Sequence, residues 1–103
     1  MSVVMSMNWP GVTKEQYEQV RGSVRWDQDV PDGAKLHVAA FDDEGAHITD
    51  VWESEEAFGR FQQERLGPGV QEAGLPGEPQ VSFYPLHGVF APALGQNEQT
   101  SDI

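Results

Sequence analysis

The clearest pattern in the chain is a strand-forming stretch that runs directly into a helix-forming one. Residues 47–53 are rich in side chains that favour β-strands, and Ser54 is followed by two glutamates and then by Phe58 and Phe61, three positions apart. A serine cap, an acidic first turn and an apolar face are typical of the start of a helix. We therefore predict a strand with Trp52 at its end, facing the side that the helix covers.

Two further stretches extend this pattern towards the N-terminus. Residues 2–9 carry hydrophobic side chains at consecutive positions, as expected for a central strand that is covered on both faces. Thr13 and Gln16 have the spacing of a capping box, which predicts a helix from Thr13 to about Trp26. The helix that begins at about Ser54 is predicted to end at about Arg65, because residues 66–69, a leucine followed by Gly-Pro-Gly, form a helix stop, and residues 70–73 are compatible with one more turn.

A turn at residues 42–45 separates the strand predicted over 35–41 from the strand that carries Trp52. Two registers are compatible with this turn. A four-residue loop places His37 opposite Asp50, whereas a three-residue loop with a glycine bulge places Val38 there and turns His37 to the other face. The residues of the turn fit the bulged form at least as well, so the sequence leaves the register open.

A last strand is predicted over residues 81–90, where Pro85 requires an edge position, a bulge or a break. The resulting order βαββαβ predicts an α+β, ferredoxin-like fold with a four-stranded antiparallel sheet. This single domain spans residues 1–90, and the polar, aperiodic residues 91–103 are expected to form a flexible tail. Helices on one face would leave hydrophobic side chains bare on the other, so we expect two copies to pair their sheets in a homodimer.

Charge and composition exclude several classes of partner. The chain has 103 residues with 17 acidic and 6 basic side chains, a net charge of -11, which disfavours binding to nucleic acid or to anionic membranes. No hydrophobic run approaches the roughly 18 residues that span a bilayer, and the N-terminus lacks the pattern of a signal peptide, so we expect a cytoplasmic protein. With no cysteine, disulfides, thiolate nucleophiles and cysteine-bound metals are excluded.

The order of elements and the sequence from Asp50 to Phe58, with Phe61, Arg65, Leu66 and Gly67 downstream, resemble the dimeric α+β barrel superfamily of the antibiotic biosynthesis monooxygenases. The resemblance covers about residues 2–90. It implies a homodimer in which each copy holds an apolar pocket between sheet and helices, without a bound cofactor.

In the cofactor-independent monooxygenases of this superfamily, an asparagine and a tryptophan bind an aromatic, polyketide-like substrate that itself donates an electron to dioxygen. Trp52 matches that tryptophan. Asn8 matches an asparagine of the related haem-degrading members, whose histidine on the second helix is missing here. The resemblance therefore implies substrate-binding roles for Trp52 and Asn8 and disfavours haem degradation.

Three titratable side chains are candidates for proton transfer. Asp50 lies in an otherwise hydrophobic strand, where a carboxylate is costly to bury unless it is paired. A carboxylate beside His37 or His87 could remove a phenolic or enolic proton, because imidazole titrates near neutral pH. The alternative is structural: Asp50 as a capping or turn residue, and the histidines as satisfied parts of the core.

The aromatic residues Trp52, Phe58 and Phe61 could line a pocket for a planar ligand, or simply fill the core. The spacing of the histidines does not support a metal site. The leading hypothesis is cofactor-independent oxygenation of a small aromatic or polyketide-like molecule. The alternatives are a non-catalytic small-molecule binder or accessory dimer, and a cofactor-free cyclase or isomerase.

Overall fold

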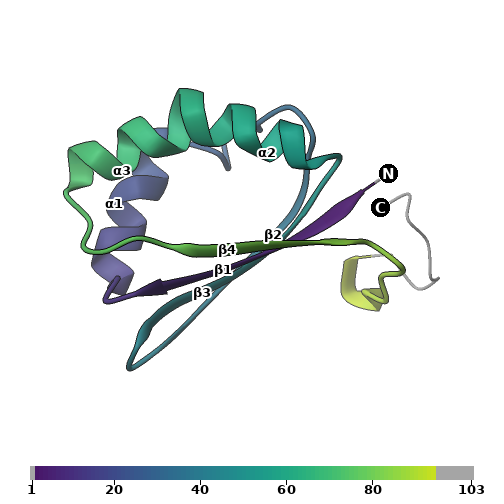
Figure 1. Ribbon diagram of the computed structural model, residues 1–103, viewed down its shortest axis with the longest axis horizontal. Coiled ribbons are helices and arrows are strands. Elements are labelled where there is room, and N and C mark those ends of the chain that lie inside the picture. The colour runs from purple at the N-terminus through teal and green to yellow at the C-terminus, as the bar shows by residue number, and fades with distance from the viewer. Residues whose placement is uncertain (1, 95–103) are drawn as a thin grey trace.

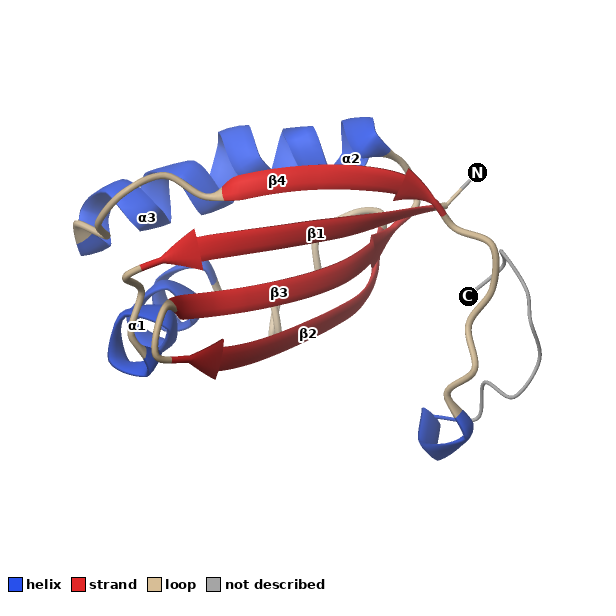
Figure 2. Ribbon diagram, turned by 60° about the horizontal axis from the view of Figure 1, so that its bottom comes forward, coloured by secondary structure: helices blue, strands red, loops and turns tan. Residues whose placement is uncertain are grey.

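A single antiparallel sheet with helices on one face makes up the computed structural model, which describes residues 2–94 (Figure 1). The elements are β1 (Val3–Pro10), α1 (Lys14–Val24), β2 (Ala34–Asp42), β3 (Gly45–Trp52), α2 (Glu55–Phe61), a π-helical turn (Gln62–Leu66), α3 (Gly67–Ala73), β4 (Gln80–Pro85) and a short 3-10 turn (Pro92–Leu94). The strand order is β2-β3-β1-β4 (Figure 2). The predicted ferredoxin-like α+β fold is confirmed.

The first helix begins as its sequence predicts. The Thr13 side chain accepts a hydrogen bond from the Gln16 backbone N–H, and the Gln16 side chain accepts one from the Thr13 N–H, which completes the capping box. The helix ends at Val24, two residues earlier than expected, because Arg25 adopts a left-handed conformation with φ of 62°. Val20 and Val24 of this helix are buried.

The prediction that the second helix stops at residues 66–69 is wrong. The helical path continues to Ala73 through a π-helical turn, in which the Gly67 N–H donates to the Gln62 carbonyl oxygen. A wider turn tolerates Pro68, which has no N–H and stands in the first turn of α3. Gly69 permits close packing on α1, since a Cβ there would lie 2.5 Å from Val24 Cγ2.

The strands β2 and β3 pair in the first of the two registers that the sequence allows. Asp42 lies opposite Gly45, so His37 lies opposite Asp50 on the face that the helices cover. The Asp42 side chain holds the turn by accepting hydrogen bonds from the backbone N–H groups of Glu44 and Gly45, at 2.9 and 3.2 Å. The bulge lies elsewhere, in β2 between Ala34 and Leu36.

β4 is an edge strand that ends at Pro85, and not at residue 90 as predicted, because proline cannot continue the ladder. The predicted tail begins at residue 91. Of it, Pro92–Leu94 form a single turn, and residues 95–103 lie outside the described residues. Within residues 2–94, no helix combines the length and the apolar character that crossing a membrane requires.

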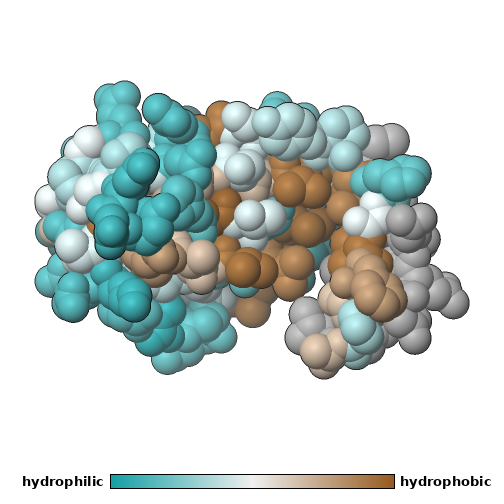
Figure 3. All heavy atoms as spheres, turned by 90° about the horizontal axis from the view of Figure 1, so that it is seen from below, coloured by the Kyte–Doolittle hydropathy of each residue, from teal (hydrophilic) through white to brown (hydrophobic). Residues whose placement is uncertain are grey.

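The face of the sheet opposite the helices carries hydrophobic side chains, which gather over its middle in Figure 3. Val38 of β2 and Tyr84 of β4 lie on this face with exposed fractions of 50% and 56%. Residues 2–94 therefore leave part of this surface uncovered.

Candidate functional site

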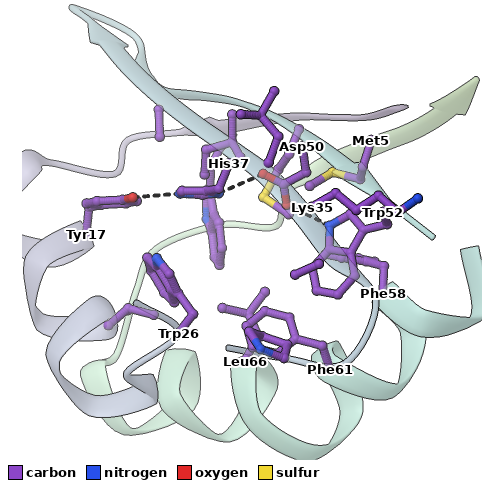
Figure 4. Close-up of a pocket in the computed structure, with 18 of the residues that line it drawn as sticks. Met5, Tyr17, Trp26, Lys35, His37, Asp50, Trp52, Phe58, Phe61 and Leu66 are labelled. Atoms are coloured by element: carbon purple, nitrogen blue, oxygen red, sulfur yellow. Dashed lines mark hydrogen bonds and ion pairs between the residues drawn. The ribbon is translucent and has the colours of Figure 1, made fainter. Parts of the chain in front are cut away.

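A cavity of about 230 Å³ lies between the covered face of the sheet and the helices (Figure 4). Its lining is mostly hydrophobic and aromatic, and includes Met5, Val20, Trp52, Phe58, Phe61 and Leu66. The polar side chains in the wall are few. This combination, an apolar enclosure with a small number of placed polar groups, is typical of a small-molecule site.

A row of four hydrogen-bonded side chains runs along one wall of the cavity (Figure 4). Tyr17 Oη lies 2.7 Å from His37 Nε2, and His37 Nδ1 lies 2.7 Å from Asp50 Oδ1. The Trp52 indole N–H donates to the other carboxylate oxygen, Asp50 Oδ2, at 2.9 Å. We refer to Tyr17, His37, Asp50 and Trp52 as the relay.

Asp50 sets the protonation pattern of the relay. Its side chain is 7% exposed, and an ionised carboxylate only accepts hydrogen bonds. In the neutral imidazole, the one His37 proton is therefore on Nδ1, which donates to Asp50, and Nε2 keeps its lone pair. The Tyr17 hydroxyl donates to that lone pair. The buried carboxylate thus has two N–H partners, which offsets the cost of its burial.

The inner end of the cavity is aromatic. The Trp52 ring lies with its centroid 5.4 Å from that of Phe58, edge to face, and 5.4 Å from that of Phe61. Trp52 is 3% exposed, so the predicted position at the end of a strand, facing the helix, is confirmed. Trp26 extends the aromatic wall towards the outer end, where its ring packs against Tyr17 and His37.

The loop between α1 and β2 covers one side of the cavity with Val30 and Pro31. Arg65, from the π-helical turn, holds the loop by donating hydrogen bonds of 2.8 Å to the backbone carbonyl oxygens of Val24 and Asp29. One guanidinium therefore ties the second helical path, the end of the first helix and the loop together.

The structure brings five of the seven predicted site residues together at the cavity: His37, Asp50, Trp52, Phe58 and Phe61. Asn8 lies on the opposite face of the sheet, where its side-chain oxygen is 2.8 Å from His47 Nδ1. His87 follows the end of β4 and is exposed. Neither of these two lines the cavity.

Tyr17 and Trp26 were missed as site residues by the sequence analysis. The helical spacing of Tyr17 with Val20 and Val24 placed it on the inward face of α1, which was the available signal. The role of Tyr17 depends on whether His37 lies on the face of the sheet that the helices cover. The sequence did not decide this, because it left the register between the two strands of the hairpin open. Trp26 lies just beyond the end of α1, where no periodicity predicts its direction.

Across residues 2–94, no group of three or more His, Asp or Glu side chains is arranged to hold a metal ion. The second histidine–aspartate pair, His47 and Asp42, lies in the open at the hairpin end of the other face, with Nε2 and Oδ2 2.8 Å apart.

No family model and no curated protein sequence matches the chain. Solved structures do. The monooxygenase from the gene ActVA-Orf6 of Streptomyces coelicolor, solved with nanaomycin D, is 22% identical, with a TM-score of 0.57 over 88% of this chain and 91% of that one. SnoaB, a cofactor-independent oxygenase from Streptomyces nogalater, is 14% identical, with a TM-score of 0.52 over 81% and 89%.

A dimeric ferredoxin-like protein of unknown function from Thermobifida fusca is also similar, with 14% identity and a TM-score of 0.55 over 82% of this chain and 90% of that one. At these identities the likeness concerns the fold. The chain shares its fold with antibiotic biosynthesis monooxygenase-like proteins and with dimeric ferredoxin-like proteins, as the resemblance in its sequence implied.

The environment of Tyr17 leads to a prediction about pH. Burial, and then the negative charge of Glu18, raise the pKa of Tyr17 from 10.0 to about 12. The folded protein therefore keeps this proton through a range in which the unfolded chain releases it, so the free energy of unfolding falls as the pH rises from 10 to 12. We expect Tyr17→Phe to show a shallower fall over this range in urea unfolding. Parallel curves for the two proteins would contradict the assignment.

Proposed function

We propose that the chain binds a small, flat, aromatic or polyketide-like molecule in the cavity and oxygenates it without a cofactor. The observation that carries this proposal is a histidine paired with a buried carboxylate in the wall of an aromatic cavity. The fold likeness to a monooxygenase solved with nanaomycin D and to a cofactor-independent oxygenase supports the choice of reaction.

Proton removal is the step that the relay is suited to perform. His37 Nε2 carries the basic lone pair, and Asp50 stabilises the imidazolium that forms when His37 takes a proton. The aromatic residues Trp52, Phe58 and Phe61 would hold a planar ring system in place by stacking and edge contacts. A ligand with an acidic phenol, enol or activated CH₂ group would become an electron-rich anion there.

Such an anion supplies the electrons that dioxygen needs. In the balanced reaction, a CH₂ group of the substrate and O₂ give a C=O group and water. One oxygen atom enters the product, the other leaves in water with the two hydrogens of the CH₂ group, and the substrate is the only reductant. Asp50 and His37 would remove the first proton. We also propose that the protein is located in the cytoplasm, as the sequence leads us to expect.

Filling the cavity tests binding. Ile48 lines the cavity, whereas Gln19 is exposed on α1 and does not line it. We expect 2-naphthol at about 100 times its dissociation constant to stabilise the wild type by about 2.7 kcal/mol in thermal unfolding. Ile48→Phe should abolish the shift, and the control Gln19→Phe should retain it. An undiminished shift in Ile48→Phe would place binding outside the cavity.

Oxygen uptake tests turnover. For a substrate identified by binding, we expect Asp50→Asn to lower the rate by about 100-fold or more, the range typical of losing a general base. His47→Gln is the matched control, because it removes the other histidine–aspartate pair, outside the cavity. An unchanged rate in folded Asp50→Asn would remove the assignment. A reaction that proceeds without oxygen would identify a cyclase or isomerase, and binding without turnover a non-catalytic binder.

We further propose that two copies form a homodimer through the uncovered face of the sheet. Val38 and Tyr84 supply exposed hydrophobic surface there, and the similar Thermobifida fusca protein is dimeric. A second copy of the chain presents the same surface, as a two-fold symmetric interface requires.

Placing a charge on this face tests the dimer. We expect the wild type to sediment with twice the mass of the chain and Val38→Asp with the mass of one chain, because an aspartate buried in an apolar interface lacks a partner. Val30→Asp is the control, since Val30 is 64% exposed and belongs to the loop over the helix-covered side. A monomeric wild type, or a dimeric Val38→Asp variant, would exclude this interface.

A further inference from the structure

The Tyr17 hydroxyl stands at one end of the relay and is hydrogen-bonded to the basic nitrogen of His37, and the Tyr17 side chain lines the cavity (Figure 4). His37 Nε2, the basic nitrogen of the relay, is already engaged by this hydroxyl at 2.7 Å. A ligand that uses this nitrogen must therefore displace the Tyr17 hydroxyl or bind to it.

The position of the hydroxyl is well determined by its surroundings. The planes of the phenol and imidazole rings are parallel to within 3°, with the ring centroids 6.1 Å apart. Trp26 and Phe41 pack edge to face on the phenol, with centroids 5.6 and 5.5 Å away. The raised pKa of Tyr17 keeps the phenol neutral, and so keeps its proton in place.

The direction of every hydrogen bond in the relay follows from its buried end. The Trp52 indole can only donate and the Asp50 carboxylate can only accept. A neutral His37 then donates from Nδ1 and accepts at Nε2, and the Tyr17 hydroxyl donates its proton to that nitrogen. Because its proton is used in this way, the Tyr17 hydroxyl can offer a ligand only an oxygen lone pair, which accepts a hydrogen bond.

We propose that Tyr17 Oη binds the ligand as an acceptor, so that the cavity selects molecules that present an O–H or N–H donor, such as phenols and enols, over ethers and ketones of the same shape. This inference rests on the proposed function for the existence of a ligand in the cavity. It goes beyond it by naming the contact atom and the ligand group that this atom requires.

The same geometry defines a route for the proton. The ligand O–H gives its proton to Tyr17 Oη while the Tyr17 proton moves to His37 Nε2. The ligand becomes an anion, His37 becomes an imidazolium paired with Asp50, and Tyr17 is neutral before and after. The histidine can thus act as base without touching the ligand, and no other reactant is needed for this step.

A matched pair of ligands, 2-naphthol and 2-methoxynaphthalene, tests the inference by isothermal titration calorimetry. We expect the wild type to bind 2-naphthol about 3- to 10-fold more tightly, the value of one net hydrogen bond. Tyr17→Phe should bring the ratio close to 1 because it removes the acceptor and keeps the ring. A preference that persists in Tyr17→Phe would place the ligand on His37 itself and overturn the assignment.

Asp50→Asn supplies a second, independent outcome. The Trp52 N–H can only donate, so the amide oxygen must face it and the amide NH₂ must face His37 Nδ1. The His37 proton then moves to Nε2, which donates to Tyr17, and the Tyr17 proton turns towards the ligand. We expect 2-methoxynaphthalene to bind more tightly to this variant than to the wild type. A purely structural relay would leave the ratio of the two ligands unchanged, as in the control His47→Gln.

The two proposals fail differently. If the wild type binds both naphthalenes without a preference, the cavity is a ligand site and the role of Tyr17 is wrong. If it binds neither, both the aromatic ligand class and the inference about Tyr17 are overturned.

Discussion

The buried carboxylate of Asp50 is the constraint on which the site depends. A carboxylate that is 7% exposed needs partners, and the structure supplies two N–H donors, from Trp52 beside it on the same strand and from His37 on the neighbouring strand. When both donors are hydrogen-bonded to Asp50, the Nε2 lone pair of a neutral His37 points to Tyr17, and the Tyr17 hydroxyl donates its proton to that lone pair. One electrostatic requirement at the bottom of the cavity therefore sets the hydrogen-bonding character at its outer end.

Local signals in the sequence were sufficient for the elements and for the inner part of the site. The capping residues Thr13 and Ser54 act through neighbours three positions away, so a single sequence reveals them. The orientation of the Trp52 side chain towards the helices was predicted because Trp52 ends a strand that runs directly into a helix. His37 was harder, because moving a hairpin register by one residue turns a side chain to the other face, and residues 42–45 were compatible with both registers.

The errors came from contacts between distant parts of the chain. Gly67, Pro68 and Gly69 were interpreted as the end of a helix, but the π-helical turn accommodates the proline and Gly69 packs against Val24, 45 positions earlier. The family resemblance brought Asn8 into the predicted site, although its position in β1 turns it to the uncovered face. The packing of Gly69 on Val24 has no signature in the residues nearby, whereas the alternation of Met7, Asn8 and Trp9 along β1 is a local signal that the resemblance overrode.

The strands β2 and β3 carry two histidine–aspartate pairs with the same donor–acceptor chemistry and opposite surroundings. His47 and Asp42 have side chains that are 44% and 54% exposed, so water competes for their hydrogen bonds and solvent screens their charges. His37 and Asp50 are 33% and 7% exposed and share an apolar cavity whose lining has six aromatic side chains, Trp9, Tyr17, Trp26, Trp52, Phe58 and Phe61. Because the residue types are the same, the low-dielectric enclosure is what distinguishes a candidate base from a surface pair.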